Sequence, residues 1–233
     1  MDKVYPSLDD AIADIPDGAS IAIGGFFTAG TPVQLIQALA RKGAKNLTVM
    51  CQSMGPGNED ITPLVVQGQI RKAICNYPFY RSATRGADSP FEKAVRAGQV
   101  ELEVYPMGTF IEKLRAAGAG LAAFYTPTGV GTVAERGKEK RKFNGREYLL
   151  EVAIKPDYAF VYAWRGDRTG NLTCRKTARN YNPDMAAAAR ITIAAVEGLV
   201  EAGELDPDKI HIPGIYVQRV VQVDRPNYIP SID

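Results

Sequence analysis

The sequence predicts an α/β fold: a mostly parallel sheet flanked by helices, with one antiparallel hairpin. Short apolar runs suited to buried strands alternate along the chain with segments of helical periodicity, a pattern typical of parallel sheets with helices on their faces. Asn144-Gly145 joins two short runs within residues 140–151, and this dipeptide is the strongest short signal for a β-hairpin. Because no repeat, low-complexity tract or linker interrupts the chain, we expect residues 1–233 to form a single domain.

The first elements are a short helix, a strand and a glycine-containing loop. Ser7 is placed to open the helix, since Leu8, Ala11 and Ile12 follow it at helical spacing. A buried strand is predicted for residues 20–23. The strand runs into a loop that spans residues 24–30 and delivers the chain to a second helix.

The second helix carries its own start and stop signals. Thr31 is the expected N-cap, and Pro32 suits the first helical position because its missing N–H would be unpaired there. Gln34 is expected to complete a capping box with Thr31. Lys42-Gly43 is expected to end the helix, whose apolar face would pack on the sheet.

The same alternation continues to the end of the chain. A long polar loop is expected from Trp164 to Asn182. After it, residues 186–189 and the apolar run from Ile191 are expected to return to the core. The predicted strands cover residues 47–51, 70–76, 100–105 and 158–163, and the predicted helices cover residues 90–96 and 111–117.

Composition excludes several classes of function. The 28 basic and 26 acidic residues leave a net charge of +2, which gives no electrostatic reason to expect nucleic acid or a membrane surface as a partner. No apolar run is long enough to span a bilayer, and the first residues do not have the pattern of a signal peptide. We therefore expect a cytoplasmic protein.

Cysteine and histidine content argues against a metal site and against a serine hydrolase. Cys51, Cys75 and Cys174 are odd in number and widely spaced, so we expect three reduced, buried thiols. His211 is the single histidine and sits between two isoleucines. It cannot build a multi-histidine metal site, and no Gly-x-Ser-x-Gly elbow accompanies it. No metal is expected.

The loop over residues 24–30 is the candidate binding site. A helix start gathers unpaired N–H groups and the positive end of the helix dipole, and glycines let a ligand approach the backbone, so an anionic or strongly dipolar ligand would suit the loop. Its spacing matches neither G-x-G-x-x-G nor a P-loop. Taken alone, the glycines also fit an ordinary strand-to-helix turn. Ligands of parallel sheets bind outside the carboxyl ends of the strands, so Gly24, Gln52 and Met107, which follow predicted strands, are the positions of interest.

The stretch from Asp17 to Pro32 resembles the signature of the small (alpha, or A) subunit of family I coenzyme A transferases. That pattern runs Asp-Gly, two free positions, three apolar residues, Gly-Gly-Phe, three free positions, Gly, one free position and Pro, and every term is met. Three later blocks also resemble this alpha chain, so the resemblance covers nearly the whole sequence. These blocks span residues 124–132, 175–182 and 213–217.

The resemblance implies a reaction and a partner. Family I transferases move coenzyme A between carboxylic acids through a covalent glutamate of the large (beta, or B) subunit, where it stands in a Glu-Asn-Gly type of motif. That motif is absent from this sequence, so we expect no catalytic residue in this chain and no activity in the chain alone. A beta subunit of similar fold is implied, with a heterotetramer as the expected assembly. Coenzyme A would be a substrate, and no permanently bound cofactor is expected.

The resemblance also assigns residues. The loop Gly24, Gly25, Phe26, Phe27, Thr28, Ala29 and Gly30 would be the coenzyme A contact. Relatives of the 3-oxoacid type commonly carry a glutamine, regarded as an oxyanion donor, where this chain has Met107, and a thioether cannot donate a hydrogen bond. Gln52 is our candidate for the missing donor, and Gln52, Met107 and Gly108 are the candidates for the oxyanion or substrate pocket.

Three functions stay open at this point. The first is transfer of coenzyme A between an acyl-CoA, such as succinyl-CoA or acetyl-CoA, and a short 3-oxoacid or 3-oxoadipate. The second is hydrolysis of acyl-CoA by a complex of the same fold, which loss of a family oxyanion donor makes worth keeping. The third is a non-enzymatic module that senses a small molecule, since the glycine loop would suit a phosphorylated ligand too.

Overall fold

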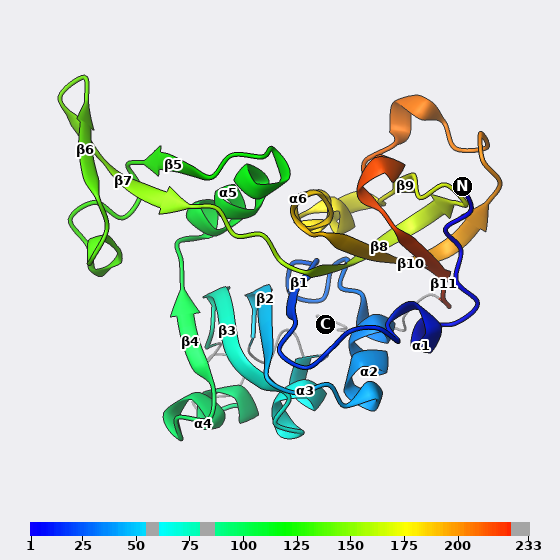
Figure 1. Ribbon diagram of the computed structural model, residues 1–233, viewed down its shortest axis with the longest axis horizontal. Helices are drawn as coiled ribbons and strands as arrows, with labels where there is room; N and C mark the ends of the chain where they lie inside the picture. Colours follow the sequence, from blue (N-terminus) through cyan, green and yellow to red (C-terminus); the bar gives the residue numbers. More distant parts are fainter. Residues whose placement is uncertain (55–60, 80–86, 225–233) are drawn as a thin grey trace, which may run out of the picture.

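The computed structural model describes residues 1–54, 61–79 and 87–224 of the chain (Figure 1). Within these residues, the main sheet has the strand order β11-β10-β8-β1-β2-β3-β4, and β9 pairs with β8. Every neighbouring pair in this order runs parallel, whereas β9 runs antiparallel to β8. The strands are β1 (Ser20–Ile23), β2 (Leu47–Ser53), β3 (Ile70–Tyr77), β4 (Glu101–Val104), β8 (Tyr158–Asp167), β9 (Leu172–Thr173), β10 (Ile191–Val200) and β11 (Arg219–Gln222).

Helices cover both faces of the main sheet. One apolar cluster joins α1 to α4 to one face, and a second joins α5 and α6 to the other. Figure 1 shows α5 and α6 in the upper part of the view and α2, α3 and α4 in the lower part. The helices are α1 (Leu8–Ala11), α2 (Val33–Lys42), α3 (Thr62–Val66), α4 (Pro90–Arg96), α5 (Met107–Gly118) and α6 (Asn182–Ala188), and the short 3-10 turns are Val133–Glu135, Lys176–Arg179, Pro207–Lys209 and Gly214–Tyr216.

Strand β1 lies in the middle of the sheet and is buried on both faces. Ile21 and Ile23 point to the cluster under α2, while Ala22 points to the cluster under α5 and α6. Ile21 and Ile23 are both fully buried, which contributes about 1.5–3 kcal/mol for each side chain. The predicted α/β fold with a mostly parallel sheet is therefore confirmed, and burial of β1 on both faces is what anchors the loop that follows it.

The order of the strands reverses at β1. The chain first extends the sheet on one side of β1, where Ile21 pairs with Val49 of β2, and later on the other side, where Ile21 pairs with Tyr158 of β8. In open parallel sheets the crevice at such a switch point, outside the carboxyl ends of the strands, is the usual place for a ligand. The loop after β1 leaves the sheet at this point.

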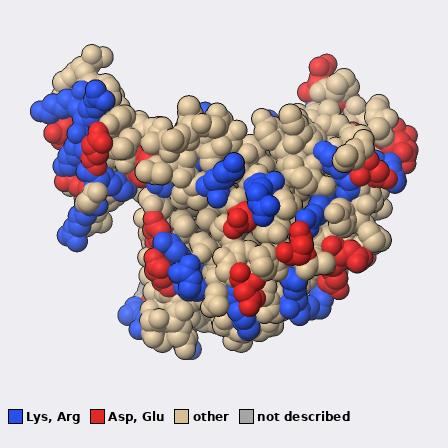
Figure 2. All heavy atoms as spheres, in the orientation of Figure 1, with Lys and Arg blue, Asp and Glu red and all other residues tan. Residues whose placement is uncertain are grey.

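A smaller antiparallel sheet projects from the main body (Figure 1). Its strands have the order β5-β7-β6, with β5 (Ala123–Thr126), β6 (Lys140–Phe143) and β7 (Arg146–Val152). The predicted hairpin is confirmed, because β6 and β7 meet at Asn144-Gly145, both with positive φ (49° and 79°) as a type I′ turn requires. Acidic and basic side chains are interspersed on this projection (Figure 2), and the buried Glu151 anchors it by pairing with Lys113 and Lys138.

The start of α2 differs from the sequence prediction. The helix begins at Val33, with Pro32 at the cap position and no side-chain cap. The Thr31 hydroxyl donates instead to the Phe27 carbonyl oxygen (2.7 Å), and Gln34 Nε2 donates to the Asp224 carbonyl oxygen (2.8 Å). The predicted capping box is therefore wrong, because the loop uses the Thr31 hydroxyl. The predicted end is confirmed, since the helix ends before a left-handed Gly43.

Three other boundaries also differ. Strand β8 runs to Asp167, so the predicted polar loop starts too early, because pairing with β10 as far as Val200 keeps polar residues extended. Helix α5 starts at Met107 rather than residue 111, directly after Pro106. Strand β2 includes Gln52, which therefore lies in the sheet and not beyond it.

The three cysteines are free and buried, as predicted. Burial raises the pKa of Cys75 to about 12 and that of Cys174 to about 11, so both thiols are protonated at neutral pH. In the part of the chain that the structure describes, no helix is both long enough and apolar enough to cross a membrane.

Candidate functional site

The loop after β1 is a closed turn held at both ends. The Gly24 N–H donates to the Phe160 carbonyl oxygen of β8 (2.9 Å), which continues the strand pairing by one residue. Phe26 and Ala29 exchange two backbone hydrogen bonds of 3.0 Å, so Phe27 and Thr28 form the tip. Phe27 has a left-handed φ of 50°, an uncommon conformation for a bulky side chain.

Two asparagines at the start of α6, Asn180 just before the helix and Asn182 as its first residue, hold the carbonyl groups of the loop. Asn180 Nδ2 donates to the Ala29 carbonyl oxygen (2.8 Å), and Asn182 Nδ2 donates to the Gly30 carbonyl oxygen (3.0 Å). Asn182 is fully buried, and its Oδ1 accepts the Tyr162 N–H of β8 (3.0 Å). Asn182 therefore connects the loop to the central sheet.

The close packing of this segment explains two of the glycines. A Cβ on Gly24 would lie 2.0 Å from Asn182 Oδ1, and a Cβ on Gly30 would lie 2.5 Å from the Ala178 carbonyl oxygen. Gly30 also has a φ of 72°, which favours glycine. The glycines thus let the loop lie against the Asn180–Asn182 segment, in addition to any approach of a ligand from the other side.

The carbonyl contacts fix where the loop N–H groups point. The chain has no cis peptide among its described bonds, so each N–H lies opposite the carbonyl oxygen of the same peptide group. The Ala29 and Gly30 carbonyl groups face the asparagines, and the Gly30 and Thr31 N–H groups therefore face away from them. Among the described residues these two N–H groups donate no hydrogen bond. Thr31 is fully buried, whereas Gly30 lines the cavity described below, so the unpaired Gly30 N–H is the donor placed to bind an anionic oxygen at this switch point.

Gln52 lies beside the tip of the loop. Its side chain is 2% exposed, and Oε1 accepts the Phe27 N–H (3.2 Å). This contact fixes the orientation of the amide, and Nε2 has no hydrogen-bond partner among the described residues. The structure therefore brings Gln52 and the glycine loop together, with the Nε2 donor still available, while its part in the chemistry stays a prediction.

Met107 and Gly108 are in a different setting. They form the first turn of α5, after β4, and both are exposed. Strand β3 separates β4 from β2, and the hydrogen bonds and ring contacts recorded for the loop do not extend to either residue. Their part in a substrate pocket stays a prediction.

Aromatic rings surround the tip of the loop. Phe26 and Phe27 pack edge to face with centroids 5.0 Å apart. Phe26 also lies near Tyr181 (6.2 Å), and Phe27 near Tyr77 of β3 (5.9 Å). Phe26 is 37% exposed, so these rings form an apolar rim that still reaches the surface. Such a rim excludes water from one side of the loop amides.

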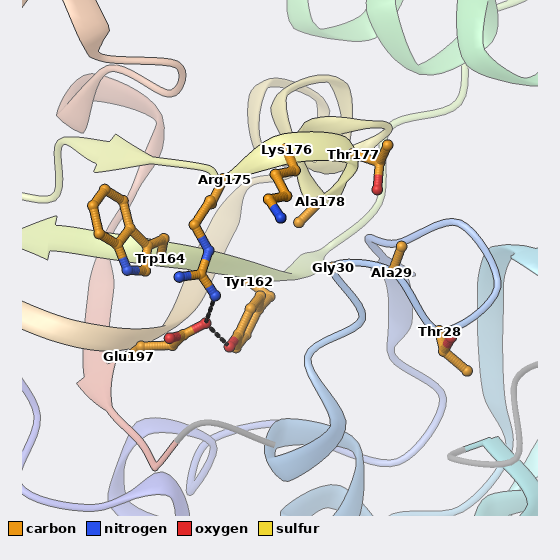
Figure 3. Close-up of a pocket in the computed structure, with 10 residues that line it drawn as sticks. All are labelled: Thr28, Ala29, Gly30, Tyr162, Trp164, Arg175, Lys176, Thr177, Ala178 and Glu197. Atoms are coloured by element: carbon orange, nitrogen blue, oxygen red, sulfur yellow. Dashed lines mark hydrogen bonds and ion pairs between the residues drawn. The ribbon is translucent and has the colours of Figure 1, made fainter. Parts of the chain in front are cut away.

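A cavity of about 240 Å³ lies next to Thr28, Ala29 and Gly30 of the loop (Figure 3). Inside it Glu197 accepts the Tyr162 hydroxyl (2.6 Å) and pairs with Arg175 (3.9 Å). These residues were missed by sequence reasoning, because Tyr162 and Glu197 look like strand core and the block over residues 175–182 carries no chemical signature. The cavity is lined by Thr28, Ala29, Gly30, Tyr162, Trp164, Arg175, Lys176, Thr177, Ala178 and Glu197.

His211 has a structural setting. Its Nδ1 accepts the Cys174 N–H (3.0 Å), and burial together with Arg179 lowers its pKa. A neutral imidazole in this place fixes β9 and has no contact with the loop. In residues 1–54, 61–79 and 87–224, no group of three or more His, Cys, Asp and Glu side chains is arranged to hold a metal ion.

Comparisons with known proteins agree with one another. Residues 5–223 match the profile of the family described as Coenzyme A transferase. The chain is 46% identical over 224 residues to the A subunit of the 3-oxoadipate CoA-transferase of Pseudomonas putida, covering 96% of this chain and 94% of the relative. It is 45% identical over 225 residues to the A subunit of the succinyl-CoA:3-ketoacid coenzyme A transferase of Helicobacter pylori, covering 97% of this chain and 94% of the relative.

A solved structure supports the fold. The glutaconate coenzyme A-transferase of Acidaminococcus fermentans superposes with a TM-score of 0.84 at 24% sequence identity, covering 95% of this chain and 76% of that chain. Identity this low bears on the fold alone. The α/β architecture predicted from the sequence is therefore found again in a solved structure.

Proposed function

Because the chain belongs to the coenzyme A transferase family, we propose that it is the alpha subunit of an enzyme that moves coenzyme A between an acyl-CoA and a short 3-oxoacid or 3-oxoadipate. The observation that carries the proposal is the loop at the switch point, where the Gly30 N–H group is unpaired, is turned away from Asn180 and Asn182 and belongs to a residue that lines a cavity. Acyl transfer passes through tetrahedral intermediates, and such donors stabilise their oxyanions.

The covalent chemistry belongs to a partner. The beta subunit supplies a carboxylate that attacks the thioester carbonyl of the acyl-CoA, and the coenzyme A thiolate leaves to give a mixed anhydride. The thiolate then attacks the carboxyl carbon of the enzyme, releasing the first acid and leaving an enzyme-bound thioester. The acceptor acid repeats these steps in reverse order. Dividing the transfer into these steps replaces one large activation barrier by several smaller ones. No water molecule is consumed or released in any of them.

This chain's contribution is to bind and to stabilise charge. The Gly30 N–H is a neutral amide whose peptide group is held through the Ala29 carbonyl oxygen by the Asn180 side chain and the Phe26 N–H, so it needs no reorganisation when the oxyanion forms. Gln52 Nε2, oriented through the bond between Oε1 and Phe27, is proposed as a further donor in place of the hydrogen bond that Met107 cannot donate. Gly24 to Phe27 and Thr28 form the rest of the coenzyme A contact. The aromatic rim limits access of water to the thioester.

The assembly follows from the division of roles. The relatives are each named as the A subunit of a transferase, which supports a beta partner that carries the glutamate. We propose two of each chain in a heterotetramer, each chain forming one domain, and coenzyme A as a substrate without a resident cofactor.

The test uses the complex of this chain with its beta subunit. The complex is incubated with succinyl-CoA in the absence of an acceptor acid, and its intact mass is measured. We expect a coenzyme A adduct on a glutamate of the beta subunit that a 3-oxoacid discharges. Steady release of free coenzyme A without an adduct would show a hydrolase, and a chain that binds ligand but forms no complex would show a sensor.

Gln52 is tested in the same assay. A Gln52→Ala variant is expected to lower kcat by about 10²-fold, the effect of removing one oxyanion donor, with little change in KM for the acyl-CoA. Unchanged kcat would remove Gln52 from the proposal and leave the Gly30 N–H as the donor that this chain is proposed to supply. The exposed Gln99→Ala serves as the matched control.

A further inference from the structure

We propose that the cavity beside Ala29 and Gly30 is a subsite for the second carboxylate of a dicarboxylic acid, with Lys176 as the residue that determines this specificity. The inference rests on the proposed function, because it assumes that the reacting carboxyl group of the acid lies at the loop amides. It deepens that function by naming the part of the substrate that this chain selects.

The charges in the cavity leave one cation without a partner. Arg175 is paired with Glu197, which also accepts the Tyr162 hydroxyl. Lys176 forms no ion pair with any described residue, and Figure 3 shows its amine pointing into the cavity beside Arg175. Two cations and one carboxylate leave a single positive charge, which one carboxylate group balances. The phosphates of coenzyme A carry more negative charge and would face Glu197.

The shape of the cavity fits a short chain. Its volume of about 240 Å³ is below the range of pockets that hold drug-sized ligands, so it suits a small acid and not a nucleotide. The ring of Trp164 forms one wall, with the Arg175 guanidinium 5.5 Å from the ring centroid. The methylene groups of a dicarboxylic acid can pack on this ring while its far carboxylate reaches Lys176.

The position of the cavity also fits. Ala29 and Gly30 line it, and the peptide group between them supplies the unpaired Gly30 N–H. An acid whose reacting carboxyl group meets that N–H therefore has the cavity directly beside it. The unpaired Gly30 N–H and the amine of Lys176 then define the two ends of one substrate.

Lys176 is held in an unusual backbone conformation. Its φ is 51°, in the left-handed region that lysine rarely adopts, and it opens the 3-10 turn Lys176–Arg179. The Ala178 N–H donates to the Arg175 carbonyl oxygen (3.1 Å) and closes this turn around it. Strain of this kind is typically kept where a side chain must point in one direction for function. Here the direction is into the cavity.

Binding is tested with the full chain, whose single tryptophan is Trp164. Its fluorescence is titrated with succinate and with butyrate, which has the same carbon number and one carboxylate, at constant ionic strength. We expect saturable binding of succinate at least tenfold tighter than that of butyrate. Lys176→Gln should remove this preference, Lys176→Arg should restore most of it, and the exposed Lys142→Gln should change nothing. Equal binding of the two acids by the unaltered chain would overturn the proposal.

Steady-state kinetics of the complex test the proposed subsite separately from the proposed transferase function. In the complex with the beta subunit, and with acetyl-CoA as the donor because its acyl group has no second carboxylate, Lys176→Gln should raise KM for dicarboxylic acceptors at least tenfold and leave kcat/KM for acetoacetate within about twofold. A rise in KM for acetyl-CoA instead would assign Lys176 to a coenzyme A phosphate and overturn the subsite. If no acid accepts coenzyme A while Lys176→Gln still abolishes the succinate preference, the proposed function fails and the subsite stands.

Discussion

Asn182 is the residue on which the geometry of the loop depends most. Replacing it by alanine leaves the Tyr162 N–H and the carbonyl groups of Gly30 and Ala178 without their side-chain partner. A buried polar group left unpaired costs about 1–3 kcal/mol, so three such groups, two of them near a cavity that admits water, give roughly 3–5 kcal/mol. That is a large part of the ~5–15 kcal/mol of a typical domain.

Urea unfolding of the full chain measures this change. We expect Asn182→Ala to lower the midpoint with an unchanged m-value. Asn182→Asp supplies a sharper test, because its carboxylate would face two carbonyl oxygens and its folded pKa would be raised. Its destabilisation should then grow as pH rises above the unfolded pKa of about 3.9. Asn180→Ala, at a half-buried position, should cost only about 1 kcal/mol. An Asn182→Ala midpoint that corresponds to a change of less than about 1 kcal/mol would refute this reasoning.

Three further predictions concern the neighbourhood of the loop. Gly24→Ala places a methyl group against the Asn182 side chain and should cost about 1–3 kcal/mol on urea unfolding and abolish transfer. The Asp157 carboxylate accepts hydrogen bonds from the N–H and the hydroxyl of Ser20, and these bonds lower the pKa of Asp157 in the folded chain. The stabilisation that Asp157 gives is therefore present above its unfolded pKa and is lost as pH falls through its folded pKa. Asp157→Asn should therefore cost about 1–2 kcal/mol at pH 7 and approach the stability of the unaltered chain as pH falls through the lowered folded pKa of Asp157. Cys75, with a pKa of about 12, should react with a thiol reagent at pH 8 only after unfolding.

Much of the fold was predictable because its signals are local. The buried strand over residues 20–23, the hairpin at Asn144-Gly145 and the end of a helix at Gly43 each follow from side chains within a few positions of one another. The boundaries that were wrong depend on distant partners. Strand β8 continues through polar residues because β10 pairs with it, and no local pattern reports that pairing.

The candidate site also has parts that follow from local sequence and parts that depend on distant residues. The glycine loop and Gln52 were found from their positions at strand ends, and the structure joins them by one hydrogen bond. The asparagines that hold the loop were not found, because their partners lie about 150 residues away in sequence. Thr31 is an example of a residue whose role cannot be predicted locally. Its position before Pro32 is typical of a helix N-cap, but its hydroxyl donates to the Phe27 carbonyl oxygen and closes the loop instead.

Oxygen labelling tests the central claim, transfer of coenzyme A through an enzyme thioester, most directly. The complex of this chain with the beta subunit is given succinyl-CoA and a 3-oxoacid in ¹⁸O-water, and the mass of the released succinate is measured. In the proposed mechanism every oxygen in that acid comes from the acyl group or from a carboxylate, so no label enters. Incorporation of one ¹⁸O per turnover would show that water attacks, and would contradict the transferase.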